Sequence, residues 1–290
     1  MFTLAHLSDP HLPPLPWPGI APLFGKRALG YLNWKRQRER IHRRDILDRI
    51  VADMQARAPD HIACTGDLIN ISLPDEYRPA REWLGLLGDA RDVSLVPGNH
   101  DAYIPAFADA PVQHWGDYAR GDDGASFPYL RKRGRLALIG LSSAVPTAPL
   151  MASGRVGAAQ LARLPQLLSQ AEREGLFRVV LIHHPPRRKT GHHKRLVDAK
   201  ELRALLAQHG AELALHGHDH INSVEHLDTP RRPLPMIGVP SASASEISEE
   251  AAGYNLYRID GEPARWTVEA ISRGLRGTTI VETDRRTFAV

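Results

Sequence analysis

Apolar runs and stretches of helical periodicity alternate along the first three quarters of the chain. A strand that is buried on both faces is apolar throughout, whereas a helix that covers a sheet repeats its apolar residues every three to four positions. The runs that predict strands cover residues 4–7, 61–65, 93–96, 136–141, 179–182 and 211–216. The periodic stretches that predict helices cover residues 45–57, 76–87, 156–174 (with a kink at Pro165) and 202–208. This order predicts a parallel sheet with right-handed crossovers.

From Ile221 onward the pattern changes to short strands with almost no helix between them. These strands are predicted over residues 223–227, 236–240, 254–259, 265–271 and 278–281. We expect them to form a second, largely antiparallel sheet that packs on the first. No internal repeat or linker interrupts the chain, so residues 1–290 are predicted to form one two-sheet domain.

Residues 12–45 depart from this pattern and form an aromatic and basic insertion. Five prolines between Pro13 and Pro22 prevent a regular helix in its first half, and residues 25–44 are predicted to be helical. Nine Lys and Arg residues stand against three Asp and Glu between Lys26 and Arg49, and a second basic cluster covers residues 187–195. Such patches attract anions. The insertion is either a lid or membrane-surface element, or a segment that packs on its own domain.

Composition sets the broad class of the protein. With 290 residues, 42% hydrophobic and 24% charged, the chain is typical of a folded soluble protein with a substantial core. Cys64 is its one cysteine, which excludes an internal disulfide and fits a cytoplasmic location. The sequence shows neither a signal-peptide pattern nor an uncharged apolar span of membrane length, so we expect no transmembrane helix. Peripheral contact with the inner face of the membrane is a further expectation from the insertion.

Metal-competent side chains follow the predicted strands. A carboxylate that two divalent ions share holds them about 3.5–4 Å apart, so that both can polarise a phosphoryl group while a bridging hydroxide attacks. Oxygen and nitrogen donors without a thiolate suit Mn, Fe, Zn or Co. The candidates at the strand ends are Asp9, His11, Asp67, Asn99, His183, His218 and His220.

The same residues carry a resemblance to a known family. Asp9-x-His11, Gly66-Asp67, Gly98-Asn99-His100-Asp101, His183 and Gly217-His218-x-His220 resemble, in order, the signature blocks of the calcineurin-like metallophosphoesterases. His183-His184-Pro185-Pro186 and the acid after His100 resemble the bacterial branch of class III cyclic-nucleotide and glycerophosphodiester phosphodiesterases. The Gly-Asp-x-x-Asp-Arg-Gly block of protein Ser/Thr phosphatases is missing, because Leu68-Ile69-Asn70-Ile71 follows Asp67. A protein phosphatase is therefore disfavoured.

The resemblance implies an α/β fold, a two-sheet sandwich flanked by helices (αββα), and a role for each motif residue. Asp9, His11 and His220 would bind one metal ion, Asn99, His183 and His218 the other, and Asp67 would bridge them. Asn99 and His100 would contact substrate. His100 would hydrogen-bond a phosphoryl oxygen or protonate the leaving alkoxide, and Asp101 is the candidate carboxylate that keeps it protonated. His184 and His216 are expected to be supporting or core residues.

The function that these features predict is a dinuclear metal-dependent phosphodiesterase in which a metal-bridging hydroxide attacks phosphorus. Mn is the expected metal, with Fe, Zn or Co as alternatives. The substrate could be a cyclic nucleotide, a glycerophosphodiester or a membrane phospholipid cleaved in the manner of a phospholipase C. A phosphomonoesterase and, more remotely, a non-catalytic scaffold are alternatives. Nucleic acid is disfavoured because no base-stacking pattern is evident, and a homo-oligomer with the insertion as dimer arm stays open.

Overall fold

The computed structural model describes residues 1–19, 25–187 and 191–290. Two parts of the sequence-based expectations lie outside these ranges. They are residues 20–24 of the insertion, with Ile20, Pro22, Leu23 and Phe24, and residues 188–190 of the second basic cluster, with Arg188 and Lys189.

Twelve strands in the described residues form two six-stranded sheets. The first sheet has the order β12-β11-β10-β1-β2-β3, with β1 Phe2–Leu7, β2 His61–Cys64, β3 Val93–Leu95, β10 Gly253–Glu262, β11 Arg265–Arg276 and β12 Thr279–Ala289. The second sheet has the order β4-β5-β6-β7-β9-β8, with β4 Tyr129–Arg133, β5 Leu136–Gly140, β6 Phe177–Leu181, β7 Leu213–His216, β8 Ser223–Leu227 and β9 Leu234–Gly238.

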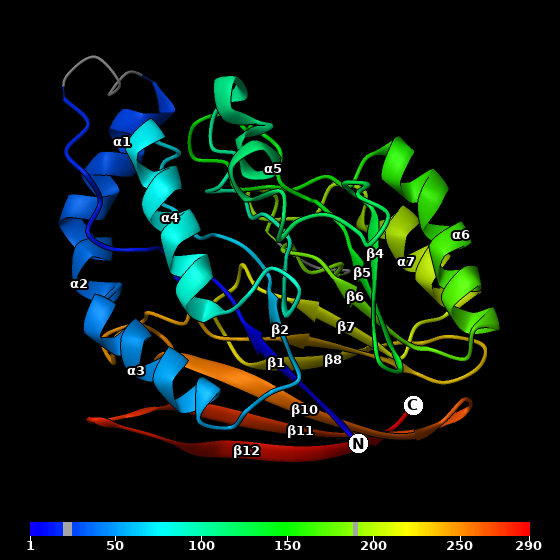
Figure 1. The fold of residues 1–290 in the computed structure, drawn as a ribbon. Helices are drawn as coiled ribbons and strands as arrows, with labels where there is room; N and C mark the ends of the chain where they lie inside the picture. Colours follow the sequence, from blue (N-terminus) through cyan, green and yellow to red (C-terminus); the bar gives the residue numbers. More distant parts are fainter. Residues whose placement is uncertain (20–24, 188–190) are drawn as a thin grey trace.

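Helices cover the outer faces of both sheets, so the layers run helix, sheet, sheet, helix (Figure 1). This confirms the predicted αββα fold class. The α-helices are α1 Lys26–Asn33, α2 Glu39–Ile41, α3 Arg44–Gln55, α4 Pro74–Leu87, α5 Ala110–Trp115, α6 Ala158–Arg173 and α7 Ala199–His209. A π-helical turn, Trp34–Arg38, joins α1 to α2, and a 3₁₀ turn covers Pro105–Phe107. None of the helices in the described ranges is both long and apolar enough to cross a membrane.

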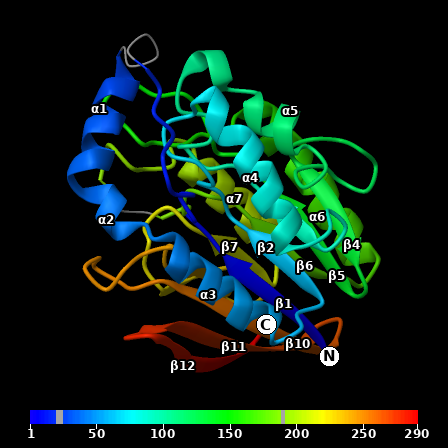
Figure 2. The ribbon, with the colours of Figure 1, turned by 60° about the vertical axis from the view of Figure 1, so that its left-hand side comes forward.

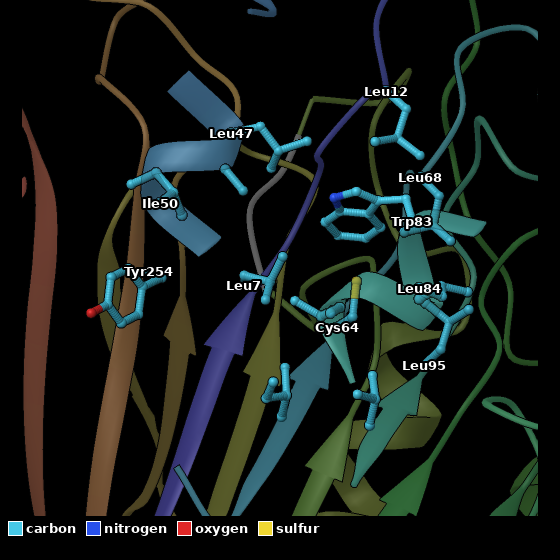
Figure 3. Packing of buried hydrophobic residues seen from close by; sticks show 14 of the residues in the cluster. Leu7, Leu12, Leu47, Ile50, Cys64, Leu68, Trp83, Leu84, Leu95 and Tyr254 are labelled. Carbon is cyan, nitrogen blue, oxygen red and sulfur yellow. The ribbon is translucent and has the colours of Figure 1, made fainter. Parts of the chain in front are cut away.

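Three apolar clusters hold these layers together, because alternate residues of a strand face opposite sides of its sheet. In β1, Leu4 packs into the cluster between the two sheets, whereas Leu7 packs beneath α3 and α4. Figure 3 shows this outer cluster, in which Leu47 of α3 and Trp83 of α4 lie above Leu7. A third cluster joins α6 and α7 to the outer face of the second sheet.

The division of the strands between the sheets differs from the sequence-based expectation. The strands after Ile221 do not form a sheet of their own. Instead, β10 pairs antiparallel with β1 and brings β11 and β12 into the first sheet, while β9 pairs parallel with β7 in the second sheet. The apolar pattern locates these strands, but the pairing of strands about 250 residues apart depends on contacts that local periodicity does not contain. The strand β4 and the helix α5 were not predicted from the sequence.

The fold brings the carboxyl ends of five parallel strands together. Within the first sheet β1, β2 and β3 run parallel, and within the second β6 and β7 run parallel. Figures 1 and 2 show α1 and α2 on the side toward which the arrow of β1 points. The insertion is therefore helical over most of its described second half and lies near the strand ends that carry the candidate ligands.

Candidate metal centre

All seven candidate ligands follow the carboxyl ends of those five strands. Asp9 and His11 follow β1, Asp67 follows β2, Asn99 follows β3, His183 follows β6, and His218 and His220 follow β7. Six of the seven residues are buried, and the side chain of His220 is 27% exposed. Ligands beyond the carboxyl ends of strands are typical of α/β sheets, so the predicted placement of the candidates is found in the structure.

The local backbone is strained at these positions. Five of the nine described non-glycine residues with positive φ are candidate ligands: Asp9, His11, Asp67, His218 and His220. A left-handed conformation costs a non-glycine residue about 1 kcal/mol or more, and such residues gather at functional sites. The chain therefore turns at Asp9-x-His11 and at His218-x-His220 instead of continuing as an extended strand.

Two motif glycines allow the ligand loops to approach one another. A Cβ at Gly98 would collide with the carboxylate of Asp67, and a Cβ at Gly217 would collide with the side chains of Ser8 and Asp9. Because no side chain fits at either position, Gly98 and Gly217 are required for the loops to meet.

One group of donors surrounds His11. Its Nε2 atom lies 3.3 Å from Nε2 of His220 and 3.9 Å from both Oδ1 of Asp9 and Oδ2 of Asp67. The Nε2 atom of His220 is 3.1 Å from Oδ1 of Asp9. Donors about 2.0–2.2 Å from a common ion are separated by such distances. The structure therefore brings Asp9, His11 and His220 together beside Asp67.

A second group of donors surrounds His183 on the other side of Asp67. Its Nε2 atom lies 3.3 Å from both Oδ2 of Asp67 and Oδ1 of Asn99. The ring of His218 lies 5.1 Å from that of His183, and its Nε2 atom is 3.1 Å from the carbonyl oxygen of Lys194, which leaves Nδ1 for an ion. The same oxygen of Asp67 thus faces both groups, which is the arrangement that a bridging carboxylate requires.

Backbone carbonyls fix which nitrogen of each imidazole faces the centre. Nδ1 of His11 donates to Ile69 at 3.2 Å, and Nδ1 of His183 donates to Thr65 at 2.6 Å. This leaves Nε2 of each ring facing the centre, near Oδ2 of Asp67. Metal-binding histidines are oriented by such outer hydrogen bonds. Burial alone would lower the pKa of His183, but the carboxylates of Asp67 and Asp9 outweigh it and raise that pKa to about 10. The two carboxylates therefore strongly favour a positive charge beside them.

The donor set fits divalent cations of the first transition row. It consists of imidazole nitrogens and carboxylate and amide oxygens, and a dication can replace the proton that Asp67 and Asp9 favour on His183. The thiol of Cys64 belongs to the core, and burial raises its pKa.

His100 also reaches the centre, but Asp101 does not serve it as expected. Nδ1 of His100 donates to the carbonyl of Asn70, and its backbone N–H donates to Oδ1 of Asp67 at 2.7 Å. The carboxylate of Asp101 instead accepts the backbone N–H groups of Gly98 at 2.8 Å, Asp67 at 2.9 Å and Ile69 at 3.1 Å. The predicted pairing of Asp101 with His100 is therefore absent from the described contacts. A buried carboxyl group beside turn amides is better placed to hold a loop than to charge an imidazole.

Arg38, which the sequence analysis did not single out, lies over the centre. Its guanidinium places Nη2 2.7 Å from Nε2 of His11 and Nη1 2.9 Å from Nε2 of His100. Burial and this guanidinium lower the pKa of His100 to about 3. The imidazolium expected there is thus not favoured while Arg38 is its neighbour. π-helical turns are frequent at functional sites, but nothing in the local sequence separates Arg38 from its neighbouring cations.

His42 is the second residue of the insertion that sequence reasoning missed. One ring nitrogen lies within 4.8 Å of donor atoms of His11 and His220. Its Nδ1 atom is 2.9 Å from Oγ of Ser243, and its ring stacks on Trp34 with centroids 6.1 Å apart. His42 could therefore contribute to the group around His11.

His184 and His216, which were expected to be supporting or core residues, both contact neighbouring polar groups, and His184 lies close to His183 and His218. His184 contacts Oγ of Ser143 at 2.8 Å and the carbonyl oxygen of Ala152 at 3.1 Å, and Nδ1 of His216 lies 3.1 Å from the carbonyl oxygen of Gly217. Both rings are engaged with their surroundings.

Comparison with known proteins agrees with this geometry. Residues 2–222 match the profile of the calcineurin-like phosphoesterases. The chain belongs to this family. Membership supports a metal-dependent hydrolase of phosphoric esters, and it confirms the family resemblance carried by the sequence motifs, although not the class III branch. A search of curated proteins finds no match.

Solved structures share the fold at low identity. A dimetal phosphatase from Danio rerio is 14% identical with a TM-score of 0.66, and the match covers 99% of this chain and 98% of that one. Purple acid phosphatase PPD1 from yellow lupin is 13% identical with a TM-score of 0.61, covering 99% and 53%. GAP50, the anchor in the inner membrane complex of Plasmodium, is 12% identical with a TM-score of 0.51, covering 100% and 89%. Because an anchor shares the fold, the fold alone does not decide function.

Proposed function

We propose that this chain hydrolyses phosphodiesters at a dinuclear metal centre. The observation that carries the proposal is the position of Asp67, whose Oδ2 atom lies 3.3 Å from Nε2 of His183 and 3.9 Å from Nε2 of His11. One carboxylate oxygen thus faces two separate groups of donors. Two divalent ions, when bound, polarise a phosphoryl group and lower the pKa of a water molecule enough for it to attack phosphorus.

The chain's own residues supply binding and orientation. The guanidinium of Arg38 presents two N–H groups toward the centre, and such a fork matches two oxygens of a phosphoryl group. Nε2 of His100 faces the same space because its Nδ1 is held by the carbonyl of Asn70. A phosphoryl group at the centre would therefore meet Arg38 and His100. There His100 can hydrogen-bond a phosphoryl oxygen or the leaving oxygen.

The space beside His100 favours a diester over a monoester. A cavity of about 510 Å³ opens beside Asn99 and His100 and extends along α1 as far as residues 150–152. A phosphomonoester has one substituent, whereas a diester needs room for a second one on the far side of the phosphorus. The His183-His184-Pro185-Pro186 block, which resembles the class III phosphodiesterase branch, supports the same choice.

The test compares one leaving group in two esters. Protein loaded with Mn²⁺ is assayed on bis-p-nitrophenyl phosphate and on p-nitrophenyl phosphate, with metal content measured on the same sample. We expect kcat/KM for the diester to exceed that for the monoester by about tenfold or more, which corresponds to about 1.4 kcal/mol of transition-state binding. Asp67→Ala should abolish both activities, and Asp48→Ala, at an exposed position on α3, should leave both unchanged.

The other functions predict different results. Preference for the monoester by the loaded protein would identify a phosphomonoesterase and contradict the proposal. A protein that retains two metal ions and hydrolyses neither ester would fit a scaffold instead.

A further inference from the structure

Helix α1 has the reverse of the usual surface pattern. Its first two residues are cations that are almost buried, with Lys26 8% and Arg27 7% exposed, whereas Leu29 and Leu32 each remain 44% exposed. A helix that packs on a core normally buries its apolar side chains and exposes its charges. The exposed leucines of α1 therefore need an explanation other than packing within the described chain.

The buried cations fix α1 firmly to the body of the protein. Arg27 donates from Nε to the carbonyl of Ile71 at 3.1 Å and from Nη2 to that of Ser72. Lys26 donates to Oγ1 of Thr147 at 2.7 Å and lies 4.2 Å from the centre of the Tyr103 ring. The outward direction of the leucines is thus set by a rigid attachment of the helix.

The leucines of α1 line the cavity that opens onto the candidate metal centre. Leu29 and Leu32 form one part of its wall, and Leu150, which is 83% exposed, and Met151 form another. The remaining lining includes the cations Lys26, Arg36 and Arg38 together with Asn99 and His100. An apolar wall and a cationic, candidate catalytic wall therefore belong to one cavity.

This combination selects a chemical class of ligand. Cations near His100 favour an anionic phosphodiester group, and the leucines favour an alkyl or acyl chain that removes their surface from water. Neither wall suits a nucleoside, because among the described lining residues Tyr103 is the one aromatic side chain and it already stacks on His100 with ring centroids 5.4 Å apart.

Exposed residues next to α1 are consistent with a ligand that comes from a membrane surface. Trp17 is 67% exposed and packs edge-on against Tyr31, with ring centroids 5.6 Å apart. Exposed cations, including Lys35 and Arg36, follow on the next turn. Tryptophan next to basic residues is typical of elements that rest on an anionic lipid surface.

We propose that the cavity along α1 binds the hydrocarbon chain of a lipid phosphodiester whose phosphate lies at the candidate metal centre. The inference deepens the proposed function and rests on it. Leu29, Leu32 and Leu150 hold the chain, and the cations of the same cavity hold the phosphate. The segment 26–38 is thus a specificity element for amphiphilic substrates.

The experiment measures how activity depends on the length of the chain. Mn²⁺-loaded protein is assayed on methyl p-nitrophenyl phosphate and on dodecyl p-nitrophenyl phosphate, both at concentrations where the esters are monomeric. In each reaction one water is consumed, the P–O bond to p-nitrophenolate breaks, and an alkyl phosphate remains. Burial of one methylene favours binding by about fourfold. Burial of only two of the added methylenes would therefore raise kcat/KM by more than about tenfold, and we expect at least this increase for the dodecyl ester.

Variants of exposed leucines locate the chain. The double substitution Leu29→Ser and Leu32→Ser, and separately Leu150→Ser, should reduce the dodecyl-to-methyl ratio toward one. Leu86→Ser is the matched control, because Leu86 is 67% exposed on α4 and lies outside the cavity lining; its ratio should equal that of the natural protein. Thermal unfolding of each variant verifies that the fold is kept. With vesicles of phosphatidylglycerol, one water should be consumed and the P–O bond to the diacylglycerol oxygen should break, so that diacylglycerol and glycerol phosphate are released.

Several results would overturn the inference. These are a ratio near one in the natural protein, a high ratio that persists in both leucine variants, or a preference for thymidine 5′-p-nitrophenyl phosphate. If neither alkyl ester is hydrolysed, the proposed function fails, and calorimetric binding of dodecyl phosphate against methyl phosphate still tests the cavity. In that case equal affinities contradict the inference, and tighter binding of dodecyl phosphate that Leu29→Ser and Leu32→Ser remove supports it.

Discussion

The guanidinium of Arg38 places Nη1 2.9 Å from Nε2 of His100, although 62 positions separate the two residues in the chain. The contact makes a residue of the insertion part of the candidate site. Loss of a charge-assisted hydrogen bond to a phosphoryl group costs about 1.5–3 kcal/mol, so Arg38→Ala should lower kcat/KM for bis-p-nitrophenyl phosphate by about 10- to 100-fold. Arg38→Lys should recover only part of the loss, because an ammonium group cannot form the bidentate fork.

The control for this substitution is Arg40→Ala, since Arg40 is exposed two positions further along the same basic segment. It should keep nearly full activity. Metal content should be the same in all three variants. A loss of metal in Arg38→Ala, or equal effects of Arg38→Ala and Arg40→Ala, would contradict a role of Arg38 in binding substrate.

Asp67 is the residue on which both donor groups depend. Asp67→Ala removes the oxygen that faces His11 and His183, so the content of Mn²⁺ after loading and gel filtration should fall well below two ions per chain. His100→Ala removes no expected ligand and should retain the metal while turnover falls. Elemental analysis beside the activity assay separates the two effects, and full metal occupancy in Asp67→Ala would exclude a bridging carboxylate.

The sequence was sufficient to predict which strand ends carry the candidate ligands. An apolar run and then a turn glycine precede the polar side chains of Asp67 and Asn99. Both the run and the glycine have local physical causes. The run is buried on two faces, and Gly98 leaves room for the carboxylate of Asp67. Such causes can be deduced from a few adjacent residues, which is why the candidate ligands were found together in space.

Other features depend on contacts that no local pattern records. The pairing of β10 with β1 joins residues about 250 positions apart, and burial alone does not name a strand's partner. Arg36, Arg38 and Arg40 look alike in the sequence, but the π-helical turn at 34–38 directs Arg38 to the centre. Adjacency was misleading for Asp101, because its carboxylate accepts loop amides instead of contacting His100.

His42 provides a test of how far the insertion contributes to metal binding. One of its ring nitrogens lies within 4.8 Å of donor atoms of His11 and His220. Substitution of a residue that orients a metal ligand typically lowers metal affinity by about 10- to 100-fold. We expect His42→Ala to lower the affinity for one of the two ions by about tenfold. Competition with a chelator measures this affinity, and the visible spectrum of the Co²⁺-loaded protein reports on the coordination. His226→Ala, at an exposed position on β8, is the control. Unchanged affinity and spectrum in His42→Ala would restrict the centre to the seven motif residues.

Acid stability tests the packing of α3 on the first sheet. The carboxylate of Asp53 accepts hydrogen bonds from Nε of Arg273 at 2.6 Å, Nη2 of Arg273 at 2.9 Å and the hydroxyl of Tyr254 at 2.5 Å. Burial alone would raise the pKa of Asp53, but these partners outweigh it and lower that pKa. A lowered pKa in the folded state means that the contribution is fully present above the unfolded value of about 3.9 and is lost as pH falls through the folded value.

Asp53→Asn should therefore lower the free energy of unfolding by about 2 kcal/mol at pH 7, because the hydrogen bonds to a charged acceptor are lost. The difference from the natural protein should shrink as the pH falls below 4, since the natural carboxylate becomes protonated there as well. Urea unfolding at several pH values measures both effects. The control is Asp48→Asn, whose exposed pair with Arg44 is an i,i+4 contact at 2.8 Å and should change stability by less than about 0.5 kcal/mol. A destabilisation of Asp53→Asn that is equally large at pH 3 and pH 7 would show that the carboxylate acts through shape and not through its charge.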